Sequence, residues 1–108
     1  MATTTVPSTI RKLFSDGQDK PPVIRDVPTP QPGEGELLIK VAAVAQNPTD
    51  WKAAAKESAG LGLGVDFAGT VVSSGPGTSA SFAPGDRVAG FTMGCLLYTS
   101  ALPTILRV

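Results

Sequence analysis

Two long apolar runs dominate the hydrophobic pattern of the chain. Residues 36–46 (ELLIKVAAVAQ) are apolar on both faces apart from Lys40, which predicts a buried central strand. Residues 66–74 (DFAGTVVSS) predict a second long strand, in which Gly69 marks a bulge or a close approach of two backbones. We expect these two strands to pair within one barrel-like sheet.

Weaker alternation on either side of these runs predicts three shorter strands. Residues 9–14 and 23–27 alternate imperfectly and predict a hairpin with a longer loop, with Val23 and, in one reading, Ile24 directed inward. Residues 87–91 (RVAGF) follow a Pro-Gly-Asp turn signal and predict the last strand.

A single helix interrupts the strands. Residues 51–58 are rich in alanine, and Thr49 or Asp50 can serve as the N-cap. Five or so short strands with one short helix predict a mainly β fold, specifically an irregular and partly open β-barrel.

Composition narrows the functional classes. The net charge is zero with no basic cluster, so we expect no nucleic-acid partner. Lys40 splits the longest apolar stretch, so we expect no membrane-spanning helix. The chain has one cysteine, Cys95, and no histidine, which indicates a reducing, cytoplasmic location and removes the commonest metal ligand and general base.

Four motifs follow one another along the chain: PGEGELLIKV at 32–41, NPTDWK at 47–52, GVDFAGTVV at 64–72 and FAPGDRVAGF at 82–91. Together they resemble the start of medium-chain dehydrogenase/reductases over residues 9–94. The version NPTDWK is most similar to stand-alone enoyl reductases that serve fungal polyketide synthases, and to related toxin-cluster oxidoreductases and quinone reductases.

The resemblance implies that residues 1–94 form an incomplete GroES-like domain of the zinc-free branch. Zinc alcohol dehydrogenases of this superfamily carry cysteine where Asn47 stands, and histidine followed by glutamate where Val65 and Asp66 stand. An amide and an isopropyl group cannot supply the thiolate and imidazole that catalytic zinc prefers. We therefore expect no metal site, and a structural hydrogen-bonding role for Asp66.

The same resemblance implies NADPH as the cofactor of the full-length relative and a small molecule as its substrate. It implies that residues 49–52 lie against the nicotinamide end and the phosphates of the cofactor, where the ammonium group of Lys52 could pair with a phosphate. It identifies no catalytic side chain in this chain. The alternative is that Thr49 or Asp50 only caps a helix, that Trp51 is core and Lys52 solvated, and that Asn47 is a turn residue. The candidate cofactor-binding residues are Asn47, Thr49, Asp50, Trp51 and Lys52.

The last segment departs from the family pattern. The match stops at Gly94, and no GxGxxG phosphate turn occurs, so we expect no Rossmann domain. The DNA sequence TGTCTCTTATACACATCT, which is the end of a transposase-based sequencing adapter, encodes CLLYTS, the sequence of residues 95–100. We interpret residues 95–108 as a non-homologous, artefactual tail; a misread intron or a genuine divergent tail are the alternatives.

Two functions remain open. In the first, the chain is the N-terminal part of an NADPH-dependent enoyl or quinone reductase, is inactive alone and binds no cofactor by itself. In the second, it is a non-enzymatic GroES-like binding or regulatory module. An incomplete barrel predicts low stability, with exposed apolar faces from Leu37, Ile39, Val41 and Val71.

Overall fold

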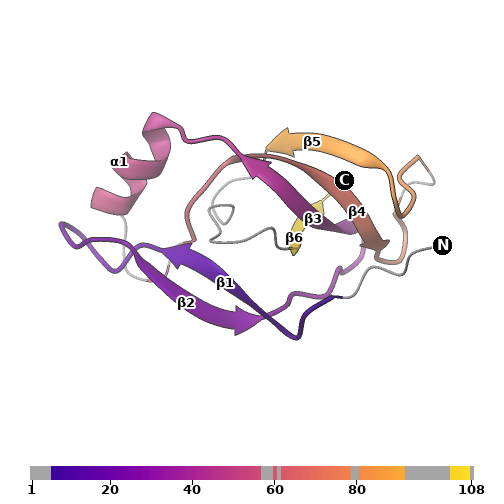
Figure 1. Cartoon of the computed structure of the whole chain (residues 1–108), viewed down its shortest axis with the longest axis horizontal. Helices are drawn as coiled ribbons and strands as arrows, with labels where there is room; N and C mark the ends of the chain where they lie inside the picture. The colour runs from indigo at the N-terminus through magenta and orange to yellow at the C-terminus, as the bar shows by residue number, and fades with distance from the viewer. Residues whose placement is uncertain (1–5, 57–59, 61, 79–80, 92–102, 108) are drawn as a thin grey trace.

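The described residues form two antiparallel sheets and one helix (Figure 1). The computed structural model describes residues 6–56, 60, 62–78, 81–91 and 103–107. A two-stranded sheet pairs β1 with β2, and a four-stranded sheet has the order β5-β4-β3-β6. The elements are β1 (Thr9–Phe14), β2 (Val23–Pro28), β3 (Glu36–Val44), α1 (Pro48–Lys56), β4 (Asp66–Ser74), β5 (Arg87–Phe91) and β6 (Pro103–Arg107).

The pairing of β3 with β4 confirms the predicted association of the two long strands. Val41 lies opposite Gly69, and the register shifts between Val41 and Ala43. A Cβ atom added at Gly69 would lie 2.3 Å from the carbonyl oxygen of Lys40. Both readings of this glycine therefore hold, since it stands at a register irregularity and allows the two backbones to approach closely.

The hydrophobic core lies on one side of the four-stranded sheet. The residues expected to be exposed, Leu37, Ile39, Val41 and Val71, are each at most 3% accessible, so that expectation was wrong. They form one cluster with Phe67, against which the half-buried side chains of Val44, Phe82 and Val88 pack. Phe82, from the loop before β5, packs against this cluster from outside the strands.

The hairpin of β1 and β2 has the predicted strands and a long connection. Ile10 is buried and pairs with Val27, whereas Ile24 is 52% exposed. Successive residues of a strand point to opposite faces, so Val23 and Ile24 cannot both turn inward. The inward assignment of Ile24 was wrong, and half-buried Val23 and Val27 share the inner face with Ile10.

The backbone of β6 pairs antiparallel with β3, from Glu36 opposite Arg107 to Lys40 opposite Pro103. This strand lies in the segment interpreted as a non-homologous tail, and the hydrophobic pattern did not predict it. It places β3 between two neighbours, which confirms β3 as a central strand. Residues 92–102, including Cys95, lie outside the described residues.

The two sheets remain separate over the described ranges, so the prediction of a mainly β domain with an open barrel and one short helix is confirmed. In Figure 1 the hairpin runs below the four-stranded sheet, and α1 stands at one end of the molecule. No helix within the described residues is long and apolar enough to cross a membrane.

Candidate functional site at the start of the helix

The N-terminus of α1 is built by the NPTD segment. The backbone N–H of Asn47 donates to Asp50 Oδ2 at 2.7 Å, and the N–H of Asp50 donates to the carbonyl oxygen of Asn47 at 2.9 Å. Asn47 is thus the N-cap, Pro48 takes the first helical position, and the third helical residue reaches back as in a capping box. The prediction that Thr49 or Asp50 is the N-cap was wrong. Proline is well suited to the first helical position, so the helix begins at Pro48 and the residue before it is the N-cap.

The side chain of Asn47 joins the helix to the sheet. Its Nδ2 donates a hydrogen bond of 2.9 Å to Oδ2 of Asp66, the first residue of β4. Both groups are partly buried, so this bond is shielded from competing water. The hydrogen-bonding role expected for Asp66 is present, and Asn47 is more than a turn residue.

The remaining predicted residues divide by exposure. Thr49 and Lys52 are exposed, and Trp51 is 65% exposed, so the alternative that Trp51 is core was wrong. Lys52 Nζ lies 5.5 Å from the centroid of the Trp51 ring, within range of a cation–π contact. Asp50, in contrast, is only 8% exposed. The outer face of the first helical turn therefore carries a hydroxyl, an indole and an ammonium group.

The other end of α1 is held by the loop between β1 and β2. The Ser15 hydroxyl donates to the carbonyl oxygen of Ala54 at 3.4 Å, and the N–H of Asp19 donates to the carbonyl oxygen of Ala55 at 3.1 Å. The last carbonyl groups of a helix lack partners within the helix, so these contacts satisfy two of them. The hairpin thereby fixes the position of the helix that carries the candidate residues.

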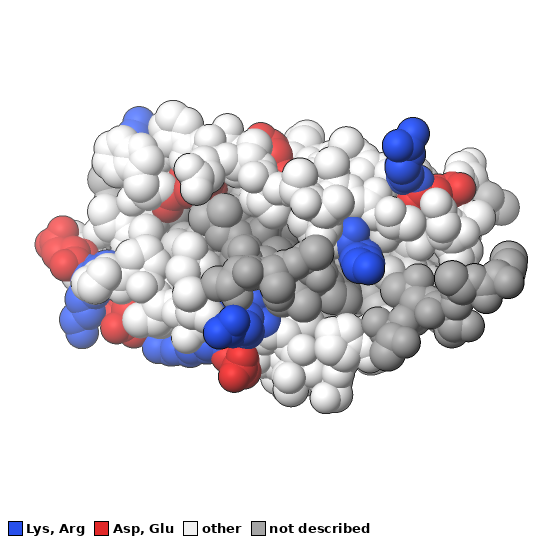
Figure 2. Space-filling view, viewed as in Figure 1, with Lys and Arg blue, Asp and Glu red and all other residues white. Residues whose placement is uncertain are grey.

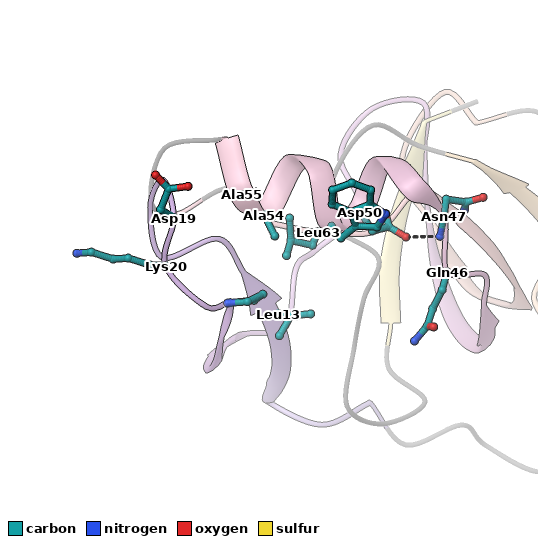
Figure 3. Close-up of a pocket in the computed structure, with 11 residues that line it drawn as sticks. Leu13, Asp19, Lys20, Gln46, Asn47, Asp50, Ala54, Ala55 and Leu63 are labelled. Carbon is teal, nitrogen blue, oxygen red and sulfur yellow. Dashed lines mark hydrogen bonds between the residues drawn. The ribbon is translucent and has the colours of Figure 1, made fainter.

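A cavity of about 570 Å³ lies between α1 and the hairpin (Figure 3). No local sequence pattern predicts this cavity, because it depends on the long-range docking of the hairpin loop on the helix. Its lining comprises Leu13, Asp19, Lys20, Pro22, Gln46, Asn47, Asp50, Trp51, Ala54, Ala55 and Leu63.

Charges on the molecular surface are mixed in sign. In Figure 2, basic and acidic atoms lie close together over the part of the surface formed by the hairpin. Two ion pairs contribute, with Arg25 Nη2 3.0 Å from Asp16 Oδ1 and Arg11 Nε 4.0 Å from Asp26 Oδ1. Exposed pairs of this kind stabilise a fold by about 0–1 kcal/mol each.

With this geometry established, comparison with known proteins identifies the family. Residues 33–103 match the alcohol dehydrogenase GroES-like domain. The chain belongs to this family. The match covers the β3–α1–β4–β5 unit and both sides of the Asn47–Asp66 hydrogen bond, and it confirms the resemblance to the N-terminal part of medium-chain dehydrogenase/reductases.

Similar proteins are considerably longer than this chain. It is 42% identical over 86 residues to the trans-enoyl reductase resD of Aspergillus sclerotiorum, covering 79% of this chain and 24% of resD. It is 43% identical over 96 residues to the trans-enoyl reductase milB of Cordyceps militaris, covering 85% of this chain and 27% of milB. The chain thus spans about a quarter of the length of these relatives.

A solved structure extends the comparison to three dimensions. An alcohol dehydrogenase superfamily protein from Novosphingobium aromaticivorans superposes with a TM-score of 0.77 at 32% sequence identity. The superposition covers 92% of this chain and 32% of the other. The chain is therefore an oxidoreductase-family domain with the GroES-like fold of that superfamily.

Proposed function

We propose that this chain is the N-terminal part of a metal-free, NADPH-dependent reductase, acting on an activated alkene such as an enoyl thioester or on a quinone. Its partner would be a polyketide synthase, in the cytoplasm. The similarity to two trans-enoyl reductases supports the enoyl substrate. The isolated chain would be inactive, because most of the length of these relatives has no counterpart in it.

The hydrogen bond between Asn47 and Asp66 carries the metal-free part of the proposal. In zinc alcohol dehydrogenases the position of Asn47 bears a cysteine ligand. Here an amide N–H at that position points to a carboxylate 2.9 Å away. A group that donates to a carboxylate does not offer a lone pair to zinc in the same orientation. Asn47 would instead hold the start of α1 at a fixed position against β4.

The exposed face of the first helical turn would lie against the nicotinamide end and the phosphates of a bound cofactor. A helix N-terminus favours negative charge, and Thr49 and Lys52 add a hydroxyl donor and a cation there. The nicotinamide, when bound, supplies the hydride. Asp50 is turned away from this face, and its contribution to cofactor binding would be to shape the turn through its bond to the N–H of Asn47.

A chimera tests the proposal. Residues 1–94 of this chain are joined to the portion of resD that follows its matching segment, and NADPH oxidation is followed with an enoyl thioester and with a quinone. We expect turnover, and about a tenfold rise in the KM for NADPH in Lys52→Ala, equivalent to about 1.4 kcal/mol. Lys40→Ala, which removes an exposed cation from β3, is the matched control and should leave the KM unchanged. A folded chimera without turnover would favour the non-enzymatic binding module.

A further inference from the structure

The cavity between α1 and the hairpin shares Asn47, Asp50 and Trp51 with the candidate cofactor residues. Asp50 and Ala54, both buried, belong to its wall, whereas Thr49 and Lys52 do not. In Figure 3 the labelled side chains of Leu13, Ala54 and Leu63 gather in the centre, and Asp50 lies beside them toward Asn47. This cavity therefore has its own chemistry.

Asp50 gives the cavity an unused hydrogen-bond acceptor. Its Oδ2 accepts from the N–H of Asn47, but its Oδ1 is buried and has no hydrogen-bond partner. Buried carboxylate oxygens are normally paired, because losing water without gaining a donor is unfavourable. The residue is 92% buried, so its unpaired oxygen is complementary to a donor brought by a ligand.

The rest of the wall is mainly apolar. Leu13, Pro22, Ala54 and Leu63 line the cavity together with Asp50, and the charged residues Asp19 and Lys20 are exposed. A volume of about 570 Å³ is within the range of small-molecule sites, in which a few polar groups orient a ligand held by apolar contacts. An anionic ligand would be repelled by Asp50.

We propose that this cavity binds a small apolar molecule carrying an N–H or O–H group that donates to Asp50 Oδ1. The proposal does not rest on the proposed reductase function, since binding requires no cofactor, although Asn47, Asp50 and Trp51 belong to both sets of residues. It assigns to Asp50 a ligand-binding role in addition to its role in the helix cap.

Four small monosubstituted benzenes test the donor requirement. The ¹⁵N-labelled 108-residue chain is titrated with benzylamine, benzyl alcohol, acetophenone and toluene, and amide shifts are followed by NMR. We expect the two donors to shift the amides of Leu13, Ala54 and Leu63, and to bind about tenfold more tightly than acetophenone or toluene. Comparing the affinities of benzylamine and benzyl alcohol distinguishes an ammonium donor from a hydroxyl donor. Equal affinities for toluene and the donors, or shifts confined to other residues, would overturn the proposal.

Two variants sharpen this test. In Asp50→Asn the new amide oxygen can still accept the hydrogen bond from the backbone N–H of Asn47. The amide NH₂ group, a donor, then takes the place of the acceptor Oδ1. Benzylamine should then bind at least about tenfold more weakly, and acetophenone more tightly. Ala55→Leu fills the cavity and leaves Asp50 intact, so all four probes should lose binding; this variant decides the question if Asp50→Asn does not fold. Unchanged binding in Ala55→Leu would place the probes elsewhere and refute the proposal.

Discussion

Asn47 Nδ2 donates to Asp66 Oδ2 across 2.9 Å, and this bond joins the first residue before α1 to the first residue of β4. The two residues are 19 positions apart in the sequence. The resemblance to the zinc branch of the superfamily implies that each occupies a position that contributes to the metal environment there. In this chain the same two positions fasten the helix to the sheet.

Removing this bond should weaken the fold. Asn47→Ala leaves the partly buried carboxylate of Asp66 without its amide donor, and hydrogen bonds to charged groups contribute about 1.5–3 kcal/mol. We expect a loss of this size in the free energy of unfolding, measured by urea denaturation. Asp66→Ala and the double variant complete a cycle, and the two losses should not add. Thr49→Ala, an exposed change in the same turn, is the control and should alter stability by less than about 0.5 kcal/mol. Strict additivity would show that the two side chains are not coupled.

The close approach of β3 and β4 predicts a sharp difference between two strand glycines. Gly69→Ala places a methyl group 2.3 Å from the Lys40 carbonyl oxygen, so the strands must separate, at a cost of about 1–3 kcal/mol or more. Gly90→Ala places it 3.5 Å from the Phe67 ring, an ordinary contact, and should change stability by less than about 0.5 kcal/mol. Thermal unfolding of both variants measures the difference. Equal melting temperatures would contradict the register.

The sequence predicted those features that depend on local patterns. Weak alternation identified β1, β2 and β5, and two long apolar runs identified β3 and β4, because burial of strand faces imposes those patterns. The start of α1 was placed too late, although Asn47, Pro48 and Asp50 have the spacing of an N-cap, a first-turn proline and a capping acid. That spacing could have located the helix start.

The features that could not be predicted depend on contacts between distant segments. The cavity exists because Ser15 and Asp19 bond to carbonyl groups of α1 more than 35 residues away, and no local pattern encodes that docking. The buried state of Leu37 and Val71 was missed for a related reason: Phe82, from a loop, packs against the cluster that contains both of them. β6 pairs with β3 from a segment that has no alternation.

The metal-free proposal predicts the zinc content of the purified chain. With an amide at residue 47 and an isopropyl group at residue 65, we expect far less than one zinc per chain by mass spectrometry. Asn47→Cys combined with Val65→His restores a thiolate and an imidazole, and this matched variant should bind Co²⁺ measurably. About one zinc per chain in the unaltered protein would overturn the assignment to the zinc-free branch.

Calorimetric titration with NADPH tests the central claim, that residues 47–52 form part of a cofactor site that needs a second domain. One charge-assisted hydrogen bond from Lys52 contributes about 1–3 kcal/mol, which alone gives an affinity no better than millimolar. The 108-residue chain should therefore show no measurable heat at micromolar NADPH, whereas the chimera with resD should bind with a micromolar Kd that weakens about tenfold in Lys52→Ala. Micromolar binding of NADPH by the 108-residue chain alone would contradict the account. So would an active chimera whose affinity for NADPH is unchanged by Lys52→Ala.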